Sequence, residues 1–136
     1  MKIKFFATIA AISLVALAGT RFSKAQTDTK ATTKEVMNMK LDYSHYILNA
    51  VATGNFSLMS ENAEKLSQLT QLSAWSGHKT TEYEVLSAEF RKHADALAKA
   101  AKERNLDAAS LAYVQMTLSC VNCHKYMRAG NKTGEL

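Results

Sequence analysis

The sequence predicts an all-α fold, an antiparallel up-down-up-down bundle of four helices. Three observations lead to this prediction. The chain contains no proline and only five glycines in 136 residues, so few positions interrupt a helix. Apolar residues recur at helical spacing in four separate segments. The connections between most of these segments are short, which makes consecutive helices antiparallel neighbours.

The first helix is expected to begin near Thr32, because Thr32 and Glu35 have the spacing of a capping box. Apolar residues then follow a 4-3-4-3 stripe. This expected inward stripe consists of Met37, Leu41, Ser44, Leu48 and Val51, with Val36 and Ile47 beside it. A turn at Thr53-Gly54-Asn55 ends the helix.

The second helix is expected over about 55–72, and a loop containing Trp75 and Gly77 follows it over 73–80. Its inward residues are Phe56, Met59, Ala63, Leu66 and Leu69. Thr81 with Glu84 has a second capping-box spacing and marks the start of the third helix. The inward stripe of that helix is Tyr83, Leu86, Phe90, Ala94, Leu97 and Ala101.

The fourth helix has the most regular pattern. A turn over 105–107 precedes it, where either Asn105 or Asp107 can serve as its cap. Apolar positions repeat at 3-4-3-4-3-4, the spacing of the inward seam of a bundle helix. These positions are Leu106, Ala109, Tyr113, Met116, Cys120, Cys123 and Met127.

Cys120 and Cys123 are the only cysteines, and His124 follows the second one directly. C-x-x-C-H is the attachment pattern of a c-type haem. Each thiol adds to one vinyl group of the porphyrin, and the adjacent imidazole ligates the iron from the proximal side. On a helix these residues fall at about 0°, 300° and 40°, a single face of about 100°. We therefore predict one covalent haem enclosed by the bundle, anchored by both cysteines and ligated by His124.

Three other interpretations of the cysteine pair were weighed against haem attachment. A thioredoxin-like redox pair is expected near a βαβ pattern, whereas this chain has no strand pattern. A structural zinc site needs four ligands, and the histidines outside the motif form no second close-spaced pair. A disulfide between residues three apart on a helix is strained and constrains almost nothing. Haem attachment is the preferred interpretation.

The N-terminal residues have the features of an export signal. Lys2 and Lys4 precede an uncharged apolar run of 15 residues over 5–19, shorter than the ~20 residues of a membrane span. Ser23-Lys24-Ala25 supplies small residues at the −3 and −1 positions of a cleavage site before Gln26. An uncleaved N-terminal anchor is the alternative.

We accordingly expect a cleavable signal peptide over 1–25 and a single haem-binding bundle domain over 26–136, with frayed ends at 26–32 and 130–136. Bacterial haem attachment takes place outside the cytoplasm, so the expected location is the periplasm, with no membrane span after cleavage. Four of the 17 basic residues lie in the signal segment, which leaves 13 against 12 acidic residues. This balance gives no reason to expect a nucleic-acid partner.

Together these features resemble the class II c-type cytochromes, the family of cytochrome c-prime and its low-spin relatives. The resemblance covers the whole expected mature chain: four helices, one haem, and C-x-x-C-H on the last helix near the C-terminus. The family tends to carry a basic residue four positions after the ligand histidine, and Arg128 stands there, which implies a place in the haem pocket. The family usually carries an aromatic residue at the third position after the ligand histidine. Met127 stands at that position here, with Tyr126 beside it.

The resemblance also implies that the first helix provides either a methionine that ligates the iron or an apolar residue that leaves the distal site open. If Gly54 is matched to the first turn of the family, counting back along the first helix to the position that faces the iron ends on Asn38. This residue lies between Met37 and Met39. Met37 is the first choice for the distal ligand, because it shares the expected stripe with Leu41, and Met39 is the second choice. Methionine also fills cores well, so a core role for Met37 is the alternative.

Several other residues have a functional and a structural interpretation. In the family an aromatic of the corresponding loop packs on the porphyrin edge, which is one role for Trp75, while capping the apolar end of the bundle is the other. His45 and His93 are expected at solvated helix positions rather than as ligands, and His78, in the loop with Gly77, is a weaker ligand candidate still. Basic residues near the haem edge either steer an acidic redox partner or provide solubility. These are Lys125, Arg128 and Lys132.

The leading hypothesis is a periplasmic monohaem electron carrier that exchanges electrons with partner proteins of a respiratory chain, with a homodimer left open. A His/Met ligand pair raises the reduction potential relative to a bis-His pair. The alternative is a five-coordinate haem protein that binds nitric oxide or carbon monoxide, and a third hypothesis is a haem-free helical interaction module. The sequence contains no pattern of a hydrolytic or group-transfer site, so no enzyme is predicted.

Overall fold

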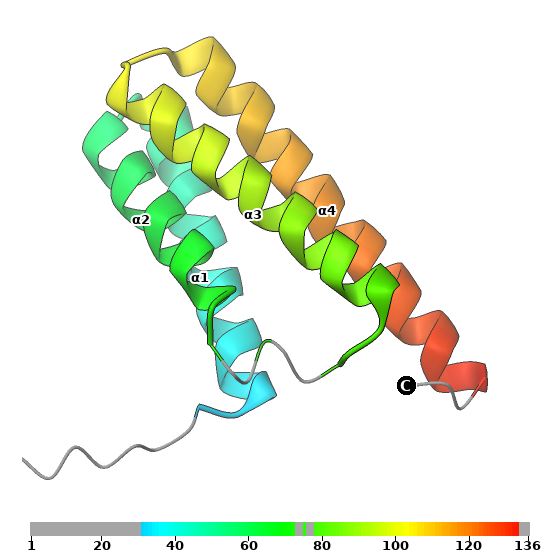
Figure 1. Cartoon of the computed structure of the whole chain (residues 1–136). Coiled ribbons are helices and arrows are strands. Elements are labelled where there is room, and N and C mark those ends of the chain that lie inside the picture. The colour runs from blue at the N-terminus through cyan, green and yellow to red at the C-terminus, as the bar shows by residue number, and fades with distance from the viewer. Residues whose placement is uncertain (1–30, 73–74, 76–77, 134–136) are drawn as a thin grey trace, which may run out of the picture.

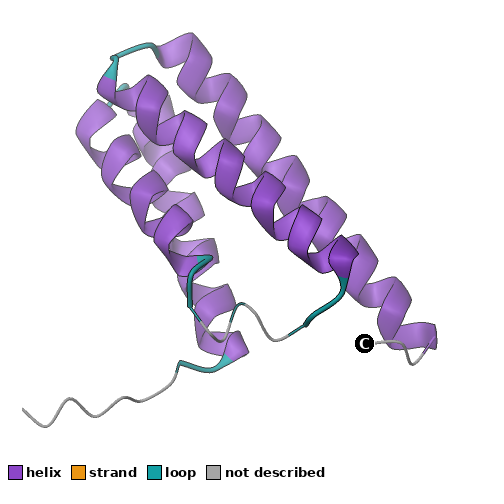
Figure 2. Ribbon diagram, in the orientation of Figure 1, coloured by secondary structure: helices purple, strands orange, loops and turns teal. Residues whose placement is uncertain are grey.

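The computed structural model describes residues 31–72, 75 and 78–133, with side chains described as far as Gly130. Within these ranges the chain forms four helices and no strand (Figures 1 and 2). They are α1 (Thr33–Thr53), α2 (Phe56–Leu69), α3 (Thr81–Lys102) and α4 (Leu106–Thr133). The all-α prediction is confirmed. The export segment and cleavage site expected over 1–25 lie outside the described residues.

A capping box starts α1, as the sequence predicts. The hydroxyl of Thr32 accepts from the backbone N–H of Glu35 at 3.3 Å, and the Glu35 carboxylate accepts from the Thr32 N–H at 2.7 Å. Gly54 ends the helix in the left-handed region, with φ +66°, where a glycine is favoured because it has no Cβ. Asn55 then caps α2, since its side-chain oxygen accepts from Leu58 N–H at 3.1 Å.

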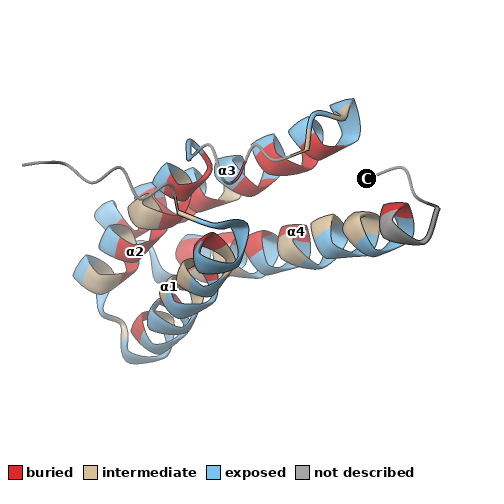
Figure 3. Ribbon diagram, turned by 90° about the horizontal axis from the view of Figure 1, so that it is seen from below, coloured by how far each residue is buried: buried red, intermediate tan, exposed pale blue. Residues whose placement is uncertain are grey.

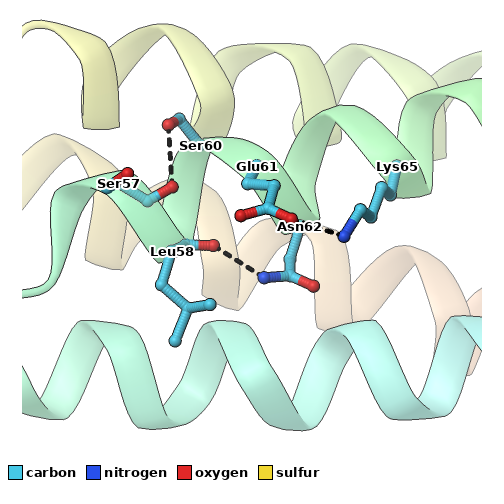
Figure 4. Close-up of polar contacts among 6 residues, drawn as sticks. All are labelled: Ser57, Leu58, Ser60, Glu61, Asn62 and Lys65. Atoms are coloured by element: carbon cyan, nitrogen blue, oxygen red, sulfur yellow. Dashed lines mark hydrogen bonds and ion pairs between the residues drawn. The ribbon is translucent and has the colours of Figure 1, made fainter.

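Polar groups of α2 are satisfied largely within the helix itself (Figure 4). The buried side-chain amide of Asn62 donates to the carbonyl of Leu58 at 2.8 Å, and Lys65 pairs with Glu61 at 2.6 Å. The helix ends at Leu69, three residues before the expected end, and Thr70 caps it. The hydroxyl of Thr70 bonds the Ser67 carbonyl at 2.6 Å, which closes the last turn.

The starts of α3 and α4 show how side-chain caps fix helix ends. Thr80 caps α3 by accepting from Tyr83 N–H at 3.2 Å, so the prediction of Thr81 as the cap was wrong by one residue. Asn105 caps α4, accepting from Ala108 N–H at 3.0 Å, which selects it over Asp107. Helix α4 continues to Thr133, into the stretch that was expected to fray from residue 130.

Each helix packs against the next in an up-down-up-down order, with the most extensive contact between α3 and α4, and α1 contacts α4 far less than it contacts α2. The two tight turns, α1–α2 and α3–α4, lie together at one end of the bundle, called here the turn end (Figure 1). The α2–α3 loop, the start of α1 and the C-terminal part of α4 lie at the other end, called here the loop end (Figure 1). None of the described helices is both long and apolar enough to cross a membrane.

The buried face of α1 differs from the expected one. Leu41 and Leu48 are 56% and 51% exposed, so the predicted stripe through them was wrong. The inward stripe is shifted by one residue toward the N-terminus, and consists of Val36, Lys40, Tyr43, Ile47 and Ala50. The shifted stripe has the same 4-3-4-3 spacing and places a lysine in the core. Figure 3 shows the buried positions of the helices in red.

The inward stripes of the other helices agree with prediction at nearly all positions. Every residue predicted inward on α3 is buried, and on α2 only Phe56 is half-buried. On α4 the seam is buried at Ala109 and Met116, half-buried from Cys120 onward, and exposed at Leu106, which was expected to face inward. The outer face of α4 carries several exposed apolar side chains, namely Leu111, Val114, Leu118 and Val121.

Candidate functional site

A cavity of ≈160 Å³ lies at the loop end of the bundle, between α1, the α2–α3 loop, α3 and α4. Most of its lining is apolar or aromatic, with a few polar groups, as is usual for cofactor pockets. The lining residues are Thr33, Met37, Lys40, Trp75, His78, Tyr83, Cys123, His124 and Met127. Three separate arguments from the sequence predicted Met37, Trp75, and the motif residues Cys123 and His124 as site residues, and the fold brings them together here.

The C-x-x-C-H motif lies two turns before the end of α4, on its inward side. Both thiols are free and half-buried, and Cys120 packs against the core. Cys123 and His124 line the cavity, and the imidazole is also reached by solvent. A hydrogen bond of 2.7 Å between Tyr126 of α4 and Thr80, the cap of α3, holds this part of α4 against α3. Two of the three motif side chains, Cys123 and His124, therefore line one cavity, whereas Cys120 is not among the lining residues.

The two methionines considered as distal ligands differ in position. Met37 is half-buried and lines the cavity together with His124, although α1 carries the one and α4 the other. Met39 is half-buried and packs against the core, and it is not among the lining residues. Because the buried stripe of α1 is shifted by one residue, Met37 lies at the border of the buried face. Ser44 lies on the same border, and its carbonyl accepts a hydrogen bond from the hydroxyl of Tyr113 of α4.

Lys40 is the residue of this site that sequence analysis missed. Only 8% of it is exposed, and its ammonium lies 4.0 Å from the Trp75 ring centroid and 4.3 Å from that of Phe90. Among the described residues no carboxylate forms an ion pair with it. The sequence does contain a pattern that indicates burial of this lysine. A second 4-3-4-3 stripe runs along α1 from Val36 to Ala50 and passes through it.

Trp75 forms one wall of the cavity and is 3% exposed. Its ring packs on Phe90 at a centroid distance of 5.3 Å, and its carbonyl accepts a hydrogen bond from the hydroxyl of Tyr83. Its indole N–H is buried and has no hydrogen-bond partner among the described residues. The side chain thus closes the apolar end of the bundle and also faces the cavity, so both structural roles considered for it are compatible with its position.

Burial and one positive charge dominate the electrostatics of the site. Burial raises the pKa of Cys120 and that of Cys123 above the ordinary value, and the nearby Lys40 ammonium opposes the shift in both. Burial lowers the pKa of Lys40 itself. The pKa of His124 is lowered by burial first and then by the positive charges of Lys40 and Arg128, which favours the neutral imidazole that a metal requires.

The remaining candidates are distributed as follows. His45 is exposed, and His93 lies 3.8 Å from the carboxylate of Glu89 on the same helix, away from the cavity. His78, expected to be the weakest ligand candidate of the three, is half-buried in the cavity lining, with its ring centroid 5.4 Å from that of Tyr83. Arg128 is exposed one turn after His124 and lies outside the lining, and Lys125 is exposed as well.

The fold and site define an all-helical protein with a cysteine- and histidine-bearing cavity at one end of four helices. Comparison of the chain with protein-family models, with curated proteins and with solved structures found no match. In the described part of the chain, no three or more His, Cys, Asp and Glu side chains are grouped as a metal site made of these residue types alone would require.

Proposed function

We propose that this protein is an exported monohaem c-type cytochrome that carries electrons and is similar to the class II cytochromes. One observation carries the proposal: Cys123 and His124 of the attachment motif line the same cavity as Met37 of a different helix. A cavity with a covalent anchor, an imidazole and a thioether from two elements has the donor set of a His/Met haem site.

The residues present fit a haem in three respects. Both thiols are free for thioether bonds, and their separation of three residues presents them on one side of α4. The imidazole of His124 is held toward its neutral form, in which its nitrogen can donate a lone pair. The apolar walls formed by Trp75 and Met127 suit the porphyrin faces.

In this proposal Cys120 and Cys123 anchor the group, His124 is the proximal ligand and Met37 the distal one. The bound haem supplies a one-electron couple between ferric and ferrous iron. The protein's contribution is to fix both axial ligands and to limit water at the iron, which favours electron transfer over turnover of a substrate. A partner protein of a respiratory chain is then the expected source or acceptor of the electron, in the periplasm. Arg128 and Lys125 lie at the exposed edge of this end and suit an acidic partner surface.

The experiment is an optical and carbon monoxide titration of the full chain, matured by haem-attachment machinery. We expect a low-spin, six-coordinate ferrous spectrum that carbon monoxide perturbs slowly or weakly, because a soft thioether binds ferrous iron well. Met37→Ala is expected to give a high-spin form that binds the gas readily. Met39→Ala is the matched control, two residues further along the same helix, and should keep the wild-type spectrum.

The outcomes separate the two haem-based functions. A high-spin wild-type spectrum with immediate carbon monoxide binding would contradict the electron carrier and favour a five-coordinate protein that binds nitric oxide or carbon monoxide. If Met39→Ala alone released the sixth ligand, the carrier function would stand and the choice of methionine would be wrong. His124→Ala should alter the spectrum while leaving the thioethers intact, and an unchanged ligand field would require another histidine, with His78 the nearest in the cavity.

A further inference from the structure

The charge of Lys40 is not balanced by any described residue. Its ammonium is enclosed by α1, the α2–α3 loop and α3, and its closest described partners are the faces of Trp75 and Phe90. A buried ammonium without a counter-ion is costly, because removing an ion from water costs roughly several kcal/mol in real proteins. The described acidic residues pair elsewhere or lie exposed on the surface.

The aromatic contacts compensate only part of this cost. A cation over a ring face gains about 0.5–2 kcal/mol, which is less than the loss of hydration on burial. The ring faces do, however, favour the positively charged form at this place, because the negative face of each π system attracts an ammonium. The site is therefore shaped to keep a cation at the inner wall of the cavity while leaving its counter-charge to be supplied from outside the described residues.

A second donor in the same wall lacks an acceptor. The indole N–H of Trp75 is buried and bonds no acceptor in the part of the chain that the structure describes, and the same side chain contacts the Lys40 ammonium. An unsatisfied buried donor costs about 1–3 kcal/mol. Two donors, one of them cationic, thus belong to neighbouring side chains that line one cavity. Among the described residues, no carboxylate forms an ion pair with Lys40 and no acceptor bonds the indole N–H of Trp75.

We propose that Lys40 and the indole N–H of Trp75 bind a propionate carboxylate of the haem inside the loop end of the bundle. This inference rests on the proposed function, because the haem is the source of the carboxylate. A carboxylate has acceptor oxygens for both donors, and a hydrogen bond to a charged group is about twice as strong as a neutral one. The pairing would neutralise Lys40 and satisfy Trp75 at once, so the porphyrin ring would be oriented by its acidic edge as well as by its thioethers.

The inference predicts that Lys40 stabilises only the haem-bound protein. In the haem-free chain, Lys40→Met replaces an unpaired buried cation by an apolar side chain of similar length and should raise the unfolding midpoint. In the matured protein the same change should lower the midpoint relative to wild type, because it leaves the carboxylate without its cation. Lys34→Met, an exposed lysine of the same helix, is the matched control and should shift neither midpoint measurably.

A porphyrin titration tests the carboxylate directly. The full chain, produced without haem-attachment machinery and kept reduced, is titrated with iron protoporphyrin IX and with its dimethyl ester, which lacks both charges. Wild type and Lys34→Met should prefer the diacid by about tenfold or more, the fold-change that one charge-assisted hydrogen bond provides. Lys40→Met should bind both porphyrins equally, and Trp75→Phe, which keeps the ring and removes the N–H, should show a reduced preference.

Four results would overturn the inference. Equal binding of the two porphyrins by wild type would remove the propionate contact while leaving the haem proposal intact. A diacid preference retained in Lys40→Met would assign the carboxylate to other residues. A change of axial ligand in the spectrum of matured Lys40→Met would make the amine an iron ligand instead. Failure of wild type to bind either porphyrin, together with a colourless matured protein, would contradict the proposed function and this inference together.

Discussion

The turn end and the loop end of this bundle are built from different kinds of side chain. The turn end is closed by tight turns and filled with aliphatic residues and alanines, such as Ile47, Ala63 and Leu97, which are fully buried. The loop end has a cavity, a buried lysine without an ion pair and a tryptophan whose N–H has no acceptor, as far as the described residues extend. Apolar packing alone accounts for the first region. At the loop end, burial of the Lys40 charge and of the Trp75 N–H is unfavourable, and apolar packing does not offset it. Such unfavourable features are typical of functional sites.

The largest expected effect is a loss of stability at the turn end. Leu97→Ala removes a fully buried side chain from a filled core and should lower the free energy of unfolding by about 3 kcal/mol, with or without haem. Met37→Ala at the loop end should cost the haem-free chain about 1 kcal/mol or less, since this side chain is only half-buried. Chemical denaturation of both variants measures the contrast.

The control for this contrast is Leu111→Ala, which removes a leucine of α4 that is largely exposed and should change stability by no more than about 0.5 kcal/mol. If Met37→Ala destabilised the haem-free chain as strongly as Leu97→Ala does, the loop end would be an ordinary core, and the distinction between the two ends would fail.

A medium effect is expected from the caps that start α1 and α2, which lie at opposite ends. Thr32→Ala at the loop end and Asn55→Ala at the turn end should each cost about 1 kcal/mol at neutral pH. They differ in acid, because only the first cap includes a carboxylate. Hydrogen bonds from the Thr32 backbone and hydroxyl lower the pKa of Glu35 below its ordinary value of 4.5.

Because the folded pKa of Glu35 lies below its unfolded value, its contribution to stability is present above about pH 4.5 and is lost as the pH falls through the lowered folded pKa. The stability difference between wild type and Glu35→Gln should therefore shrink from pH 7 to pH 3, measured by denaturation at each pH. The difference for Asn55→Ala should stay constant, and a constant Glu35→Gln difference would contradict the reciprocal cap.

The smallest effect is expected in the α3–α4 turn. Arg104 has φ +55°, in the left-handed region that favours glycine, and its guanidinium lies 4.9 Å from the Phe56 ring centroid. Arg104→Gly should relieve the backbone strain, lose the ring contact, and raise stability by about 0.5 kcal/mol on balance. Arg104→Ala loses the contact without relieving the strain and should be less stable than wild type in thermal unfolding. The reverse order of these two variants would show that the ring contact outweighs the strain.

Sequence patterns predicted the four helices well because capping and periodicity are local properties. Thr32 with Glu35, Gly54 and Asn105 act as expected, and the α3 stripe is buried at every predicted position. The predicted cap of α3 was wrong by one residue because Thr80 and Thr81 are adjacent residues with the same capping chemistry, and only the tertiary contact of Thr80 with Tyr126 distinguishes them.

The site was harder to predict because it depends on rotation of one helix. Two stripes one residue apart run along α1, and hydrophobicity favoured the one with Leu41 and Leu48, which are exposed. The correct stripe contains Lys40, and a lysine is normally assigned to the surface. Packing of Lys40 on Trp75 and Phe90 joins residues 35 and 50 positions apart, so no local pattern contained it.

The central claim is that the motif at the loop end carries a covalent haem, and the direct measurement is haem retention under denaturing conditions. Wild-type chain from cells with haem-attachment machinery should keep its haem stain on a denaturing gel, because thioether bonds survive unfolding. Cys120→Ala with Cys123→Ala should lose the stain, whereas Leu111→Ala, on the outer face of the same helix, should retain it. A colourless wild-type band would contradict the haem-based account and would favour a haem-free helical interaction module.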